Sequence, residues 1–196
     1  MVFDDKVITN ISAYFIGNKG IMDIGGSFYI YGTTLDDKLH SDNGYASIFV
    51  KAGHDIVVSD SGADMLYAGA DNDKIYLEEG NDEIYGRSAH DNLFGGGGND
   101  ILNDLFGNDV IADFGNVTDE DILHFKDLKR DEVGFSLNGT NLLIPDMTRD
   151  GNYVEIIDCV TNQRNYIEQF DFRYHQVMIF VDYKNSFDYQ ININLV

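Results

Sequence analysis

The sequence predicts an all-β fold, in which short parallel strands wind into a solenoid with a cap at each end. Two columns of residues recur at a period of nine and are the basis of this prediction. The aspartate column consists of Asp55, Asp64, Asp73, Asp82, Asp91, Asp100 and Asp109. The aliphatic column stands two residues after each aspartate and consists of Val57, Leu66, Ile75, Ile84, Leu93, Leu102 and Ile111.

A period of nine fits a short strand followed by a tight turn, with two repeats in each coil of the solenoid. Glycine stands two residues before most positions of the aspartate column, at 53, 62, 80, 98 and 107, and at 44 before Ala46. It permits backbone conformations with φ > 0 at little steric cost, which a tight turn needs. We expect the aliphatic residues to point inward, where each coil covers the next.

The aliphatic column is longer than the aspartate column. It continues backwards without a break through Ile48, Leu39, Ile30 and Ile21. The aspartates extend only to Asp37, with a gap at Ala46. The solenoid should therefore be longer than its acidic stretch.

Two repeats per coil place successive aspartates on opposite edges of the solenoid. The first edge carries Asp55, Asp73, Asp91 and Asp109, and the second edge carries Asp64, Asp82 and Asp100. Stacked carboxylates about 4.8 Å apart, one strand spacing, repel one another. Calcium relieves this repulsion, because it takes six to eight oxygen ligands from carboxylates and backbone carbonyls. The pattern thus predicts Ca²⁺ on the aspartate edges.

The repeat resembles the RTX family of hemolysin-type calcium-binding nonapeptides, whose consensus is G-G-x-G-x-D-x-U-x with U aliphatic. GGGGNDILN at residues 95–103 matches best, and LEEGNDEIY, SDSGADMLY, AGADNDKIY, DLFGNDVIA and GRSAHDNLF match in part. The resemblance covers about residues 32–115 and implies a parallel β-roll. It also implies that each ion lies between successive turns of one edge. The implied ligands are the seven aspartates of the column and turn positions Gly62, Gly80, Gly95, Gly98 and Gly107.

The repeat departs from this consensus unevenly. The first pair of glycines is largely lost, and turns of the first edge contain Lys51, Arg87 and His90. We expect weaker or missing ions on that edge and stronger sites on the second edge. Ala46 should remove the first site of the second edge. A worn-down repeat that folds as a solenoid without metal is the alternative.

The segments on either side of the repeat are expected to cap it. Residues 1–31 form the N-terminal cap, and residues 116–196 form a C-terminal cap of mostly antiparallel strands. Turn signals at Asn138-Gly139, of type I′, and at Asp150-Gly151 predict two hairpins in the second cap. This cap loosely resembles the region after the repeats in hemolysin-like proteins. A C-terminal segment directs type I secretion in the family, and either such a signal or an edge strand explains the final ININLV.

Composition narrows the class of function. Thirteen Lys and Arg face thirty-four Asp and Glu, a net charge of −21, which argues against partners such as nucleic acid or anionic membranes. No apolar run approaches the roughly 20 residues of a membrane span. The start MVFDDKVITN lacks the features of a signal peptide. The chain is therefore either cytosolic or exported by a route that does not use an N-terminal signal. The resemblance to the RTX family implies the second, a secreted or cell-surface protein that leaves by the type I machinery. A single cysteine, Cys159, excludes an internal disulfide and leaves metal as the stabilising link.

Two functions remain open, and neither is enzymatic. The sequence has no H-E-x-x-H zinc motif and no G-x-S-x-G nucleophile elbow. The segment Asp146–Gly151 resembles the start of an EF-hand loop, but the twelfth position of that loop is Ile157, where a calcium-binding Glu is required. The leading hypothesis is a calcium-binding module of an exported toxin, adhesin or enzyme, which folds when it meets calcium outside the cell. The alternative is a recognition module for polysaccharide or a partner protein. Tyr67, Tyr76 and Tyr85 form a stripe that supports this alternative, although ordinary strand-forming residues explain the stripe as well.

Overall fold

The structure is a computed structural model that describes residues 7–8, 28–41, 43–116, 118–159, 167–173 and 176–179. The predicted inward position of Ile21 and the C-terminal ININLV lie outside these residues. The solenoid strands are β1 Val7–Ile8, β2 Phe28–Tyr31, β3 Lys38–His40, β4 Ala46–Ala52, β5 Ile56–Val58, β6 Met65–Ala70, β7 Lys74–Tyr76, β8 Glu83–Ala89, β9 Asn92–Phe94 and β10 Ile101–Ala112. The later elements are β11 Ile122–Phe125, the 3₁₀ turn η2 Arg130–Glu132, β12 Ser136–Asn138, β13 Asn141–Pro145, β14 Tyr153–Ile156, β15 Gln169–Phe172 and β16 Gln176–Ile179.

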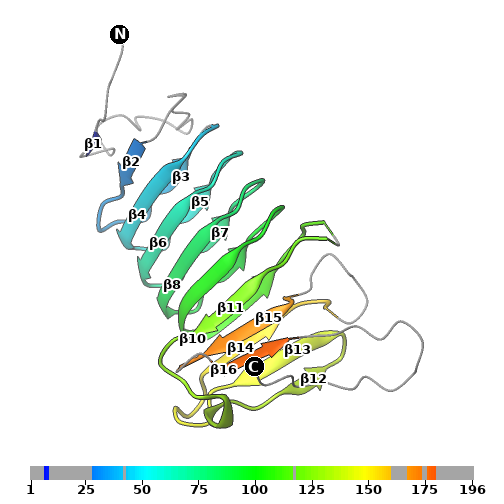
Figure 1. The fold of residues 1–196 in the computed structure, drawn as a ribbon. Coiled ribbons are helices and arrows are strands. Elements are labelled where there is room, and N and C mark those ends of the chain that lie inside the picture. Colours follow the sequence, from blue (N-terminus) through cyan, green and yellow to red (C-terminus); the bar gives the residue numbers. More distant parts are fainter. Residues whose placement is uncertain are drawn as a thin grey trace.

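The strands stack in two layers along the solenoid, with the N-terminal coils at one end and the C-terminal strands at the other (Figure 1). The first layer runs β1, β2, β4, β6, β8, β10, β11 and β15, and the second runs β3, β5, β7, β9, β10 and β14. Strand β10 belongs to both layers, because its first part pairs with β8 and its last part with β9. All solenoid pairings are parallel, as the sequence predicts.

From β2 to β10 each coil contains eighteen residues, and the aliphatic column forms its core. In the first layer Ile48 pairs with Leu66, Leu66 with Ile84, and Ile84 with Leu102. All ten column residues from Ile30 to Ile111 are buried, none more than 3% exposed. Burial of one such side chain contributes about 1.5–3 kcal/mol. The prediction of an inward aliphatic ladder is confirmed, including its extension to Leu39 and Ile30.

The C-terminal segment continues the solenoid before it turns antiparallel. Leu123 of β11 pairs in register with Leu102, and Phe170 of β15 pairs with Leu123. In the second layer Ile156 of β14 pairs with Ile111. Strand β13 is then antiparallel to both β12 and β14, and β15 is antiparallel to β16. The described part of the cap is thus parallel where it meets the roll and antiparallel beyond it.

The first predicted hairpin forms, but its turn is displaced by one residue. Asn138 pairs with Asn141, so the turn residues are Gly139 and Thr140 rather than Asn138 and Gly139. Only Gly139 has a positive φ, 66°, whereas type I′ requires two such residues. Asn138 stays in the strand, where its amide donates to a carboxylate oxygen of Glu155 at 3.3 Å. The predicted turn position was therefore wrong.

The second hairpin joins β13 to β14 through the loop that contains Asp150 and Gly151. Pro145 pairs with Tyr153, and Gly151 has a φ of 85°. The Asp146 carboxylate accepts hydrogen bonds from the Thr148 amide at 2.8 Å and from the Arg149 guanidinium at 3.2 Å. These bonds hold a turn, which agrees with the rejection of an EF-hand.

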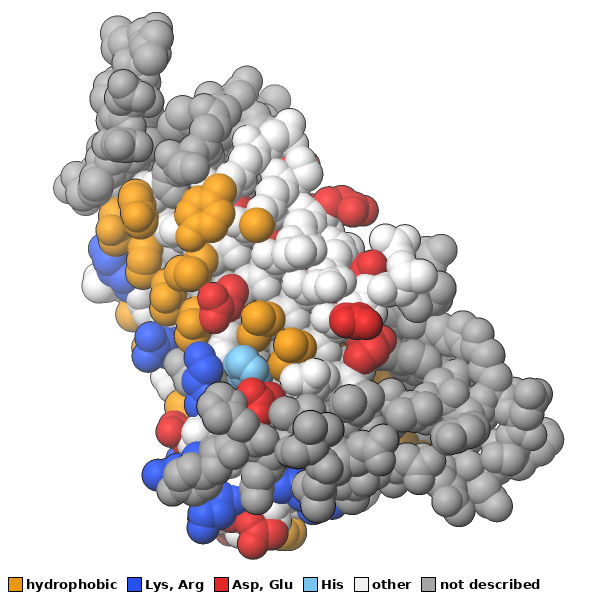
Figure 2. Space-filling view, viewed as in Figure 1, with side chains coloured by type: hydrophobic (Ala, Val, Ile, Leu, Met, Phe, Trp, Pro, Cys, Tyr) orange, Lys and Arg blue, Asp and Glu red, His pale blue; other side chains and the backbone are white. Residues whose placement is uncertain are grey.

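The tyrosines of the predicted stripe lie in two layers. Tyr67 and Tyr85 stack at 4.5 Å between ring centroids, within a row that also contains Tyr31 and Phe49. Tyr76 lies in the other layer, stacked on Phe94 at 4.6 Å. The expectation of one stripe was wrong, because a nine-residue step is half a coil and changes layer. On the face shown in Figure 2, hydrophobic side chains run along the repeat body with Lys and Arg side chains beside them.

Candidate metal centre

The seven aspartates of the column form two ladders, one on each edge of the roll. Each is at most 2% exposed. The Oδ1 atom of each aspartate accepts a hydrogen bond from the backbone N–H of the residue eighteen positions earlier, at 2.7–3.0 Å. The first ladder runs from Asp37 to Asp109 and the second from Ala46 to Asp100. Bonds of this kind to a carboxylate contribute about 1.5–3 kcal/mol each.

The second carboxylate oxygen of every one of these aspartates is buried without a hydrogen-bond partner. This holds for Oδ2 of Asp55, Asp64, Asp73, Asp82, Asp91, Asp100 and Asp109. A buried ionised oxygen without a partner is costly, so it needs a counter-charge. Calcium prefers such oxygens, and a stack of them along one edge offers each ion carboxylates from successive coils. The residues present therefore fit the ion.

Burial shifts the aspartates strongly toward their neutral form in the metal-free protein. It raises the pKa from the ordinary value of 3.8 to about 6 at Asp55 and Asp64, to about 7 at Asp82, Asp91 and Asp109, and to about 8 at Asp73 and Asp100. Repulsion between stacked carboxylates adds to the effect at Asp73 and Asp100. The hydrogen bonds from the backbone amides act in the opposite direction but are outweighed.

The five glycines named from the sequence lie in the turns for two different reasons. Gly62, Gly98 and Gly107 have φ values of 144°, 119° and 138°, which side chains rarely tolerate. Gly80 and Gly95 are needed for space. A Cβ atom at Gly80 would lie 1.9 Å from the carbonyl oxygen of Gly62, and one at Gly95 would lie 2.5 Å from Oδ2 of Asp100.

The turns of the two edges differ in backbone strain. Four non-glycine residues of the repeat body have positive φ, and all four belong to first-edge turns: Lys51 at 88°, Asp71 at 73°, Arg87 at 74° and Ala89 at 97°. Each costs about 1–3 kcal/mol. Second-edge turns place only glycines in this region among the described residues. The residues that replace consensus glycines in first-edge turns therefore keep the turn conformation, but they lower the stability of the fold.

The basic side chains of the first edge lie over the aromatic row. The Nζ atom of Lys51 is 6.0 Å from the ring centroid of Tyr31, and the Arg87 guanidinium carbon is 5.7 Å from that of Tyr67. His90 accepts a hydrogen bond at Nδ1 from the Asn108 amide at 3.0 Å, and its own amide donates to the side chain of Asn72. His90 thus joins neighbouring coils of the roll.

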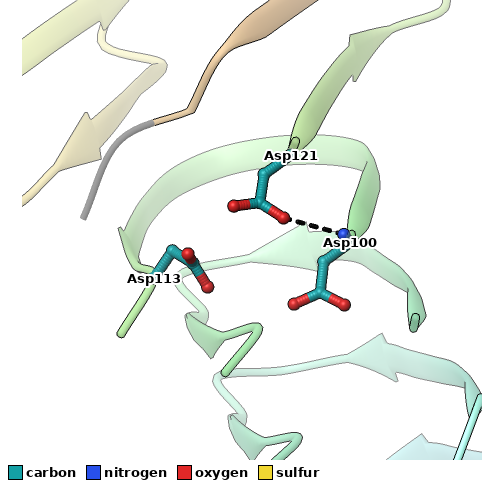
Figure 3. Close-up of side chains that lie close together, drawn as sticks. All are labelled: Asp100, Asp113 and Asp121. Atoms are coloured by element: carbon teal, nitrogen blue, oxygen red, sulfur yellow. Dashed lines mark hydrogen bonds between the residues drawn. The ribbon is translucent and has the colours of Figure 1, made fainter. Parts of the chain in front are cut away.

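Sequence reasoning missed a carboxylate cluster at the end of the repeat. Asp100, Asp113 and Asp121 offer oxygens within 4.8 Å of one another, and all three are buried (Figure 3). The second ladder continues through them, because Asp121 accepts from the Asp100 amide at 2.8 Å and Glu168 accepts from the Asp121 amide at 2.9 Å. Asp121 is two residues before the aliphatic Leu123, as in the repeat, but three residues out of the nine-residue frame. A search for Asp-x-aliphatic without a fixed period would have found it.

Two ladders of buried aspartates on a parallel solenoid define a calcium-binding β-roll. A family model described as "RTX calcium-binding nonapeptide repeat (4 copies)" matches residues 31–66, 49–84 and 85–112. The repeat body therefore belongs to the RTX family of calcium-binding repeats.

Similarity to individual known proteins is slight. No curated protein matches the chain. Among solved structures, the crystal structure of extracellular lipase LipA from Serratia marcescens is similar at 13% identity with a TM-score of 0.26. The match covers 68% of this chain and only 38% of the lipase chain. Among the described residues, no helix is long and apolar enough to cross a membrane.

Proposed function

We propose that the chain is the calcium-binding module of an exported protein, and that calcium drives its folding after type I secretion. The observation that carries the proposal is the set of seven buried aspartate Oδ2 atoms without hydrogen-bond partners. The proposal assigns the module a structural role, with no catalysis of its own.

The cost of the buried charges supports coupling of folding to calcium. The pKa of Asp82 rises from 3.8 to about 7, so keeping this carboxyl ionised in the metal-free fold costs about 4 kcal/mol, at about 1.4 kcal/mol per pH unit. Three such costs reach about 12 kcal/mol, and a typical domain is stable by only about 5–15 kcal/mol. A fold with all seven aspartates ionised is therefore unstable at neutral pH unless a cation binds. The binding free energy of calcium then becomes folding free energy.

The overall charge supports export as an extended chain. At a net charge of −21 the chain repels itself when no cation is bound. Such a chain suits passage through a secretion channel in low calcium, and calcium outside the cell would then compact it. We accordingly place the folded module outside the cell or on its surface.

We propose as calcium ligands the seven aspartates of the two ladders, together with turn carbonyls near Gly62, Gly80, Gly95, Gly98 and Gly107. The second edge should bind more tightly than the first. Among the described residues, second-edge turns place only glycines in the left-handed region, whereas first-edge turns place Lys51, Asp71, Arg87 and Ala89 there. The backbone strain of the first-edge turns reduces the net free energy of calcium binding on that edge.

Binding of polysaccharide or a partner protein is the weaker alternative. A sugar stacks on the open face of an aromatic ring. In the row from Tyr31 to Tyr85 neighbouring rings are parallel within 11°, at 4.5–5.1 Å, so they cover each other's faces. This row is better explained as packing between coils than as a platform for sugars.

Circular dichroism of the full chain tests the proposal. At pH 7.5 we expect a disordered spectrum in EGTA and a β-rich spectrum after excess calcium, with magnesium as the matched control. Magnesium should be much less effective, because it demands octahedral geometry and dehydrates reluctantly. A β-rich spectrum already present in EGTA would refute folding on calcium.

A further inference from the structure

We propose that Asp100, Asp113 and Asp121 form one calcium site shared by the last coil of the repeat and the C-terminal segment, so that the ion fastens this segment to the roll. The inference rests on the proposed function, since Asp100 also belongs to the second ladder. It goes further, because the family match ends at residue 112 and two of the three ligands lie beyond it.

The three carboxylates come from different parts of the chain and converge on one place. Asp100 directly precedes β10, Asp113 follows the last residue of β10, and Asp121 directly precedes β11. Their oxygens lie within 4.8 Å of one another (Figure 3). None of the three side chains is more than 2% exposed.

Two oxygens of the cluster are directed over Gly95. A Cβ atom there would lie 2.5 Å from Oδ2 of Asp100 and 3.0 Å from Oδ1 of Asp113. The Asp100 oxygen is fully buried and has no hydrogen-bond partner. Asp113 replaces the first consensus glycine of its repeat, so it adds a third carboxylate where interior sites of the second edge have aspartates of two coils only.

The charge of the cluster calls for a divalent cation. Among the described residues, no ion pair involves any of the three carboxylates. Three buried carboxylates without a basic partner match calcium, which takes several carboxylate ligands at once.

The site would control how the following strand docks. The Ile122 amide donates to the carbonyl oxygen of Asp100 at 2.8 Å, and the Asp100 amide donates to the carboxylate of Asp121. An ion between these aspartates therefore acts where β11 joins the roll. Without it, repulsion between them opposes the same contact.

The test compares Asp113→Asn with the wild-type full chain. Asn keeps one oxygen that can accept the Gly96 amide, which Asp113 now accepts at 3.1 Å, but it removes the charge. Asp127→Asn is the matched control, because Asp127 is an exposed carboxylate in the loop after β11. Calorimetry measures calcium stoichiometry and affinity, and amide hydrogen exchange measures protection of β11.

We expect Asp113→Asn to lose one ion, or to bind it at least about tenfold more weakly. Calcium should still protect β4, β6 and β8 in this variant, but β11 should lose its calcium-dependent protection. Asp127→Asn should match wild type. If Asp113→Asn fails to fold in saturating calcium, Asp121→Asn provides the same readout, since it keeps an acceptor for the Asp100 amide.

Three results would overturn the shared site. Unchanged stoichiometry and affinity in Asp113→Asn would exclude Asp113 as a ligand. An equal loss in Asp127→Asn would mean that net charge alone decides binding. A wild-type chain that binds no calcium would refute the proposed function together with this site, whereas normal binding by the variant refutes the site alone.

Discussion

Acid should partly replace calcium in folding the roll. A carboxyl whose pKa is higher in the fold than in the unfolded chain stabilises the fold when it is protonated. That contribution is fully present below the unfolded pKa, near 4, and is lost as the pH rises through the folded pKa. The ladder aspartates have folded pKa values of about 6 to 8, so the loss falls between about pH 4 and pH 8.

The size of the effect follows from these pKa values. Lowering the pH from 8 to 5 should restore about 1 kcal/mol at Asp64, whose pKa is about 6, and about 4 kcal/mol at Asp73, whose pKa is about 8. Seven ladder residues act in the same direction. The calcium-free chain should therefore gain β structure and a higher melting temperature at pH 5.

The assay is far-ultraviolet circular dichroism with thermal melting, on protein freed of calcium over a chelating resin. EGTA is unsuitable, because protons compete with calcium for it at pH 5. Sodium chloride at 1 M and pH 8 is the control, since it screens exposed charges over about 3 Å but does not reach buried carboxyls. Equal or lower stability at pH 5 than at pH 8, or full recovery with salt alone, would refute the reasoning.

Three comparisons test the turns and edges of the roll: one variant against wild type, and two pairs of variants against each other. Ala89→Gly should raise the free energy of unfolding in calcium, followed by thermal melting, by about 1 kcal/mol, because Ala89 has a strained φ of 97°. A less stable variant would show that Ala89 is not strained. Gly98→Ala should cost several kcal/mol, since its Cβ would lie 1.6 Å from a carbonyl oxygen, whereas Gly139→Ala, with nothing within 4 Å, should cost only about 1 kcal/mol. Calorimetry should show that Asp82→Asn weakens calcium binding more than Asp91→Asn does. Equal losses of affinity would contradict the proposal that the second edge binds calcium more tightly than the first.

The repeat body was predictable because its information is periodic. Each aliphatic residue of the column, such as Leu66 or Ile84, has the same spacing to its aspartate and therefore the same place in the coil. Placement of the aspartates on two edges followed from two repeats per coil. The sequence did not predict that each aspartate Oδ1 accepts a hydrogen bond from a backbone N–H of the preceding coil, because this bond depends on the side-chain rotamer.

Features outside the period were missed or misplaced. Asp121 is three residues out of frame, so a search at fixed spacing passes over it, and Asp113 stands where the consensus has glycine. The prediction of a single tyrosine stripe was wrong because successive nine-residue repeats lie in opposite layers of the roll. Asn138 was placed in a turn by local propensity, but its hydrogen bond to Glu155 of β14 keeps it in the strand.

A crystal structure of the full chain grown in saturating calcium tests the central claim most directly. Anomalous scattering should locate ions along the second edge, each bound at about 2.3–2.6 Å by carboxylate oxygens of successive aspartates such as Asp82 and Asp100. Their Oδ2 atoms, now without hydrogen-bond partners, should be among the ligands. A roll that folds in calcium with water, or no ion, at these oxygens would contradict the account.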